Sequence, residues 1–145
     1  MKTLIARAVA GAIAGAMLLS PLPGAAQSGD ATSRPVRGSA QRIAILNAIR
    51  PAVEAELGPP VEFVVTCLQV ENGWALVNAQ PQRRGGRPID PHVLSDWEYR
   101  DGLTVTAVLR FQHRRWNVTG HAIGATDVWY DGQVPRSLQR QPCSR

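Results

Sequence analysis

The feature that most constrains the fold is the alternation of side chains in residues 103–130, on either side of His113-Arg114. Successive side chains of a β-strand point to opposite faces, so two alternating runs joined by a two-residue turn predict an antiparallel hairpin. The register from this turn places Thr106 opposite His121 on a mixed, half-exposed face. The other face is apolar and pairs Phe111 with Trp116, Leu109 with Val118, Ala107 with Gly120 and Val105 with Ala122.

A second hairpin is predicted for residues 61–80, with its turn at Asn72-Gly73, a dipeptide that favours the type I′ geometry. Pairing outward from this turn puts Leu68 on one face and Cys67 on the other. The earlier bulky residue Val65 has the opposite parity to Leu68. We therefore expect a β-bulge between Val65 and Cys67 that returns the bulky residues to one side.

One amphipathic helix is predicted for residues 40–57. Ser39 suits the N-cap position, and Gly58-Pro59-Pro60 ends the pattern. Its apolar residues recur at helical spacing and are Ile43, Leu46, Ile49, Val53 and Leu57.

These elements predict an α+β fold, in which one N-terminal helix packs on a curved, four-stranded antiparallel sheet. The layout is similar to cystatin-like and nuclear-transport-factor-like folds, an analogy of fold that carries no function. The predicted strands are residues 61–71, 74–80, 103–112 and 116–123.

The start of the chain indicates a secretory signal peptide, residues 1–26. Lys2 and Arg7 form a positive region, residues 8–19 are apolar, and small residues lead to a cleavage site near Ala26. A membrane anchor is the alternative, but the apolar run is shorter than the roughly 20 residues a spanning helix needs. We expect a periplasmic or secreted protein with no membrane span after cleavage.

The remaining chain is long enough for one compact domain. Residues 27–38 lack periodicity and are expected to be a flexible arm, residues 39–135 form a single α+β domain, and residues 136–145 form a C-terminal tail. Removing Lys2 and Arg7 leaves 14 of the 16 basic residues against 11 acidic ones. This mild charge, with arginine clusters in turn-like sequence such as residues 83–87, favours solvated loops over nucleic-acid binding.

Both cysteines, Cys67 and Cys143, follow the predicted signal peptide. In an oxidising compartment an even pair predicts a disulfide, whereas a redox or metal site would call for C-x-x-C or nearby histidines, which the sequence lacks. Because Cys67 lies on the face opposite Leu68, the C-terminal tail must reach it over the outside of the sheet.

Titratable residues offer weak catalytic candidates. His121 with Asp127 suits general acid–base chemistry, and Asp90, His92 and Asp96 form a local cluster whose spacing matches no metal template. We favour a hydrogen-bonded role for His121 and solvated roles for the loop residues, and we predict no metal site and no cofactor. Candidate binding residues on the polar sheet face and its aromatic edge are Trp129, Tyr130, Thr106 and Asn78.

The runs ILNAIRPAVEAELGPPVEFVV, GWALVNAQPQ, DGLTVTAVLRF, RWNV and AIGATDVWYDG resemble a family of small exported bacterial proteins of unassigned function. The likeness covers about residues 45–135 and implies no activity. We therefore expect a non-enzymatic binding or interaction domain whose partner is an envelope protein or a small molecule. The alternative is a small hydrolase or isomerase with a pocket built around His121 and Asp127.

Overall fold

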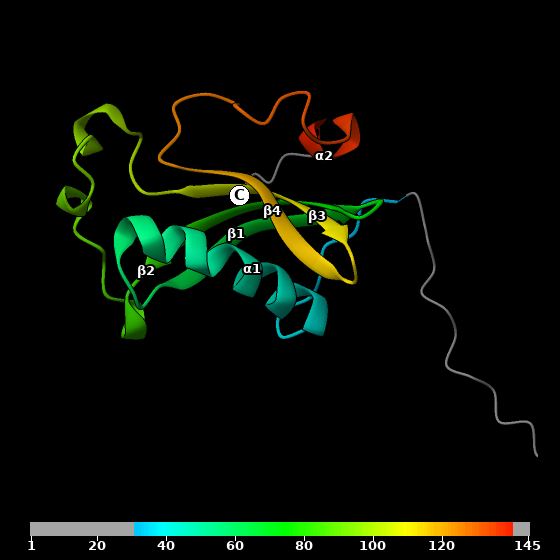
Figure 1. The fold of residues 1–145 in the computed structure, drawn as a ribbon, viewed down its shortest axis with the longest axis horizontal. Helices are drawn as coiled ribbons and strands as arrows, with labels where there is room; N and C mark the ends of the chain where they lie inside the picture. The colour runs from blue at the N-terminus through cyan, green and yellow to red at the C-terminus, as the bar shows by residue number, and fades with distance from the viewer. Residues whose placement is uncertain (1–30, 141–145) are drawn as a thin grey trace, which may run out of the picture.

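The computed structural model describes residues 31–140. In this part of the chain, helix α1 (Ala40–Leu57) lies on one face of an antiparallel sheet whose four strands are neighbours in chain order (Figure 1). A short helix, α2 (Arg136–Arg140), lies on the opposite side of the sheet. This arrangement confirms the predicted α+β fold. The strands are β1 (Glu62–Glu71), β2 (Trp74–Gln82), β3 (Val105–Gln112) and β4 (Arg115–Ile123).

Helix α1 is capped at both ends by side chains. Ser39 accepts a hydrogen bond from the backbone N–H of Arg42 at 3.3 Å, as predicted for an N-cap. The guanidinium of Arg83 donates to the carbonyl of Leu57 at 2.7 Å and to that of Gly58. Arg83, predicted to be a solvated loop residue, therefore satisfies carbonyl groups that the end of the helix leaves open.

The buried face of α1 differs from the predicted apolar stripe in its first half, where Ile45, absent from that stripe, is buried. Its buried residues are Ile45, Ile49, Val53 and Leu57, four residues apart, whereas Ile43 is 50% exposed. The helix lies over β3 and β4. Ile43 and Leu46 therefore lie on the flank of α1 that borders β1.

Both predicted hairpin turns are confirmed. Asn72 and Gly73 have φ of 48° and 73°, and His113 and Arg114 have φ of 52° and 63°. Positive φ at both central residues defines the type I′ turn, whose twist matches that of the flanking strands. The second turn adopts this geometry without glycine.

Two β-bulges bend the sheet. The predicted bulge is confirmed, since the register shifts between Val65 and Cys67. A second shift, not predicted from the sequence, lies opposite Val108 and Leu109 and leaves Thr119 as the extra residue of β4. His121 consequently pairs with Ala107 and not with Thr106.

This second bulge corrects the predicted face of His121. From Gly120 onward, each residue of β4 lies on the sheet face opposite to the predicted one. His121 and Ile123 therefore point toward α1, while Gly120 and Ala122 point away from it. Ile123 becomes 2% exposed within the main core. Burial of this large apolar side chain explains why the strand adopts the bulge.

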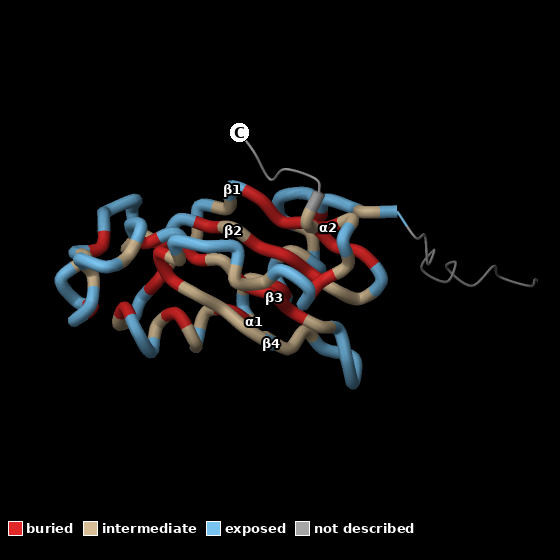
Figure 2. Tube along the Cα trace, turned by 90° about the horizontal axis from the view of Figure 1, so that it is seen from above, coloured by how far each residue is buried: buried red, intermediate tan, exposed pale blue. Residues whose placement is uncertain are grey.

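The sheet separates two hydrophobic clusters, and buried residues follow the strands and α1 (Figure 2). The main cluster lies between α1 and the sheet and includes Ile89 and Leu94 of the long segment between β2 and β3. The second lies on the opposite face and contains Leu76, Val108, Val134 and Leu138, with Trp74, Trp129 and Tyr130 packed against it. Leu138 lies beyond residue 135, the predicted end of the domain.

Residues 31–38, part of the predicted flexible arm, are attached to the edge of β1. Ser33 and Val70 exchange two backbone hydrogen bonds of 2.8 Å. The hydroxyl of Thr32 donates to the carboxylate of Glu71 at 2.6 Å. Within residues 31–140, no helix is long and apolar enough to cross a bilayer.

Candidate functional site

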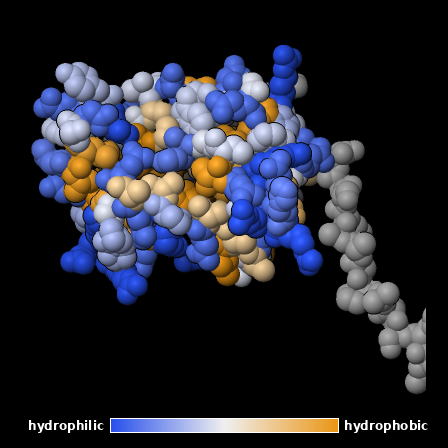
Figure 3. Space-filling model, viewed as in Figure 1, coloured by the Kyte–Doolittle hydropathy of each residue, from blue (hydrophilic) through white to orange (hydrophobic). Residues whose placement is uncertain are grey.

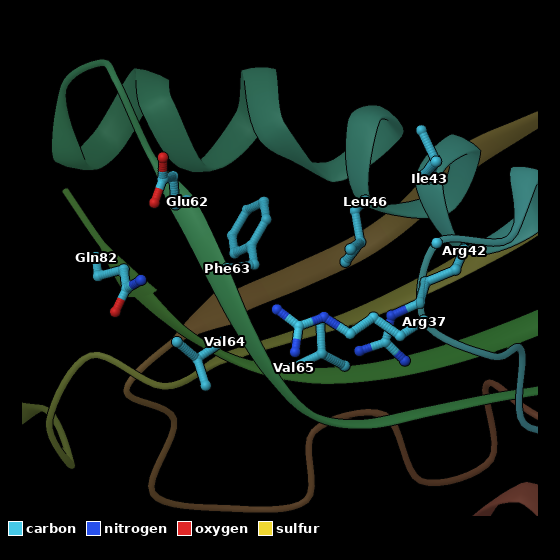
Figure 4. Close-up of a pocket in the computed structure, with 10 residues that line it drawn as sticks. Arg37, Arg42, Ile43, Leu46, Glu62, Phe63, Val64, Val65 and Gln82 are labelled. Atoms are coloured by element: carbon cyan, nitrogen blue, oxygen red, sulfur yellow. The ribbon is translucent and has the colours of Figure 1, made fainter. Parts of the chain in front are cut away.

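A groove of about 400 Å³ lies between the first half of α1 and the edge strand β1 (Figure 4). Arg37 and Arg42 lie side by side at one end of it, and Glu62 and Gln82 lie at the other. The lining also contains the apolar residues Ile43, Leu46, Phe63, Val64 and Val65. The groove thus combines an apolar floor with charges of opposite sign at its two ends.

Local sequence explains each wall of the groove. Ile43 and Leu46 are three residues apart and so share one flank of the helix. The bulge after Val65 turns Phe63 and Val65 toward the α1 side, where they pack against the main core. Because α1 covers β3 and β4, the flank between the helix and β1 is left unfilled.

The two arginines of the groove have no acidic partner in the described part of the chain. The ion pairs among residues 31–140 involve Asp90, Glu56 and Asp96, none of which lines the groove. Arg42 donates to the carbonyl of Pro35 at 3.3 Å, which positions its guanidinium without neutralising it. This end of the groove therefore carries uncompensated positive charge.

Exposed apolar side chains accompany the groove. Ile43 and Val64 are 50% and 49% exposed. Apolar patches interrupted by polar side chains also mark the face of the molecule seen in Figure 3.

His121, the predicted catalytic residue, lies outside the groove and pairs with α1. Its Nε2 is 2.7 Å from Oε1 of Glu56, and the two side chains are 25% and 35% exposed. Arg100 extends the network, since its NH1 lies 3.9 Å from Oε2 of Glu56 and donates to the carbonyl of Ile123 at 2.7 Å. The cluster joins α1, β4 and the segment before β3.

Asp127, predicted to act with His121, is exposed after the end of β4. The carboxylate that contacts His121 is that of Glu56. Within residues 31–140 no hydrogen bond or ion pair joins Asp127 to His121. Glu56 lies 65 residues from His121 along the chain, and no local sequence pattern points to it as the partner of His121.

The acidic cluster of the long segment divides into two local pairs. Asp90 accepts hydrogen bonds from the backbone N–H of His92 at 3.0 Å and from its Nδ1 at 2.7 Å, and these bonds lower the pKa of Asp90. Asp96 receives two hydrogen bonds from Arg100, of 2.8 and 3.0 Å, which lower the pKa of its carboxyl. Asp96 is thus held by an arginine and not by Asp90 and His92.

The predicted binding residues lie on the sheet face that carries α2. Thr106 donates to Oδ1 of Asn78 at 2.8 Å, so these two satisfy each other. Trp129 contacts Tyr130 edge to face, with ring centroids 5.7 Å apart, and covers Gly120. Both aromatic residues pack on the second hydrophobic cluster, which is a structural role.

Arg37, Arg42 and Phe63 were not singled out from the sequence. Two signals could have drawn attention to them: basic residues on both sides of the N-cap Ser39, and Ile43 as an apolar residue off the buried stripe.

No protein-family model, curated protein or solved structure matches this chain. The resemblance to small exported proteins therefore stays a prediction.

Proposed function

We propose that this protein is an exported, non-enzymatic binding domain whose ligand occupies the groove between α1 and β1. The ligand has an apolar body and an acidic group. The observation that carries the proposal is the placement of Arg37 and Arg42, without acidic partners in residues 31–140, at one end of an apolar groove. Hydrogen bonds between arginine and a carboxylate are among the strongest that proteins make.

The lining of the groove favours binding over catalysis. Among the described residues that line it, there is no histidine, cysteine, serine or threonine, and Glu62 is the only carboxylate. Nucleophilic or acid–base catalysis would need such groups within hydrogen-bonding reach of each other. His121 is engaged with Glu56 in a network that joins secondary-structure elements.

Titration with decanoate tests this proposal. Decanoate supplies an apolar chain and a carboxylate, while decyltrimethylammonium has a similar chain and the opposite charge. Hydrogen bonds to charged groups contribute about 1.5–3 kcal/mol, so the variant Arg37→Gln/Arg42→Gln should bind decanoate at least about tenfold more weakly by calorimetry. The control is Arg114→Gln/Arg115→Gln, at the exposed β3–β4 turn. Equal binding of both ions, or equal loss in both variants, would contradict the proposal.

We also propose export through cleavage near Ala26 and a disulfide between Cys67 and Cys143. Residues 1–30 and Cys143 lie outside the described part of the chain. Support for the bridge comes from the position of α2, since Ser137 donates to Glu71 at 2.6 Å on the strand that carries Cys67. Four residues of strand span about 13 Å. The three helical steps from Ser137 to Arg140 rise about 4.5 Å, and the three residues that follow can add up to about 10 Å, which is enough to bring Cys143 to Cys67.

Two measurements check these proposals. The mass of the protein recovered from the periplasm or medium should correspond to a chain that begins at Gln27. Thiol titration of the denatured, unreduced protein should find no reactive thiol, and reduction should release two. Two thiols before reduction would show that the bridge is absent.

A further inference from the structure

Strand β1 forms one edge of the sheet, and the chain's own arm covers only part of that edge. Ser33 pairs with Val70 in antiparallel orientation, so the residues that follow Ser33 run back along β1 toward Val65. The arm ends at Arg37 and Gly38, which line the groove; Gly38 has a φ of 82° and leads the chain into α1. The edge beyond this point is open.

The open stretch of β1 is short and bounded at both ends. It comprises Glu62–Val65, which in the described part of the chain make no backbone hydrogen bond outside the sheet. On the far side it is closed at Val61, whose N–H donates to Glu54 at 2.9 Å and whose carbonyl accepts from Arg50. At about 3.3 Å per residue, the stretch is about 13 Å long.

The N–H and C=O groups on the outer side of an edge strand are a template for one more strand. A segment paired there would place alternate side chains over the apolar floor formed by Phe63, Val65 and Leu46. Hydrogen bonds between the two main chains would contribute affinity, and the groove would accommodate the side chains of the added segment. Both features coincide at Glu62–Val65 of β1.

The end of the open stretch near Arg37 indicates which chemical group of a bound segment would contact the two arginines. An added strand is obstructed beyond Val65, because Arg37 and Gly38 line that end of the groove and Ser33 pairs with Val70 further along the same edge. A chain that terminates at this point presents its α-carboxylate to Arg37 and Arg42. An internal loop of a partner would have to turn away at the position where the positive charge lies.

On the basis of the function proposed above, we infer that the groove binds the C-terminal residues of a partner polypeptide as a short added strand. The α-carboxylate pairs with Arg37 and Arg42, the last side chains lie over Phe63 and Val65, and the segment runs parallel to β1. A second copy of β1 fits less well, since that strand has 10 residues and would meet the arm. The occupant is therefore a chain end of apolar character.

Peptide binding tests this inference. The probes are acetyl-Val-Thr-Val-Thr-Val with a free C-terminal carboxylate, the same peptide as its C-terminal amide, and the free acid methylated on alternate backbone nitrogens. We expect the amide and the methylated peptide to bind the full chain at least about tenfold more weakly than the free acid. In Arg37→Gln/Arg42→Gln the acid and the amide should bind alike, whereas Arg114→Gln/Arg115→Gln should keep the difference.

Hydrogen exchange supplies an independent readout of pairing. The free-acid peptide should slow exchange of alternate amides within Glu62–Val65, and decanoate should not. Acid and amide peptides of equal affinity, or unchanged exchange with bound peptide, would overturn the inference. Failure of the peptides while decanoate still binds would overturn it and leave the proposed function standing. Failure of both probes would overturn both.

Discussion

Two positions require glycine, because an added Cβ would come too close to a neighbouring group. At Gly120 an added Cβ would lie 2.9 Å from Cζ3 of Trp129, so the absence of a side chain lets the indole cover the strand. At Gly124 it would lie 2.2 Å from the carbonyl oxygen of Gly102, and φ is 63°. A backbone neighbour cannot rotate away as a side chain can, so Gly124 is the stricter requirement.

Replacement of Gly124 by alanine should therefore destabilise the fold by more than the cost of its positive φ alone. Gly132 is a matched control, because its φ is 76° and a Cβ there would meet nothing within 4 Å. The positive φ costs about 1–2 kcal/mol in either variant, and the clash at Gly124 should add about 1–3 kcal/mol. Urea denaturation measures both; equal losses for Gly124→Ala and Gly132→Ala would contradict this account.

At the scale of elements, the two bulges show what alternation can and cannot predict. The bulge before Cys67 was predictable, because bulky Val65 and Leu68 signal a change of parity. The bulge at Thr119 lies before Gly120 and His121, where small and polar side chains give little parity signal. A shift of one residue then moved His121 to the other face.

The position of α1 on the sheet could not be predicted from the sequence pattern either. Both Ile43 and Ile45 are compatible with an apolar stripe, and only packing on β3 and β4 selects Ile45. The groove arises from that choice together with the bulge in β1. A pattern of single residues contains neither the crossing of helix and sheet nor the path of the arm, so the candidate site could not be predicted.

The contact between His121 and Glu56 should stabilise the attachment of α1 to β4. Both groups are partly exposed, so solvent screening keeps their coupling small, about 0.5–1 kcal/mol. A double-mutant cycle with His121→Ala and Glu56→Ala measures this coupling from the free energies of unfolding. The matched control is the pair of His92 and Asp90, which is 66% and 69% exposed and should couple more weakly. A coupling at His121 no larger than the control would show that the contact does not stabilise the fold.

At the scale of the whole molecule, one carboxylate holds both ends of the described chain to the sheet. Oε1 of Glu71 accepts from Ser137 and Oε2 accepts from Thr32, each at 2.6 Å. The segment before α1 and the segment that contains α2 therefore both contact β1 at this residue. Glu71 is 7% exposed, so these hydroxyl groups take the place of water around its charge.

Acidification should release both terminal segments from β1. The hydrogen bond from Ser137, and then that from Thr32, lower the pKa of Glu71 against the opposing effect of burial. Because the folded-state pKa lies below the unfolded value of about 4.3, the stabilisation is complete above that pH and is lost as the pH falls through the folded pKa. Exchange of the Ser33 and Val70 amides, corrected for intrinsic rates, should accelerate as the pH falls below about 4 and stay constant from about pH 5 to 7. In Glu71→Gln the loss of charge-assisted bonds should cost about 1–2 kcal/mol and leave protection of these amides low at every pH. An unchanged pH profile in that variant would assign the transition to other carboxylates, such as Asp96, whose pKa is also lowered.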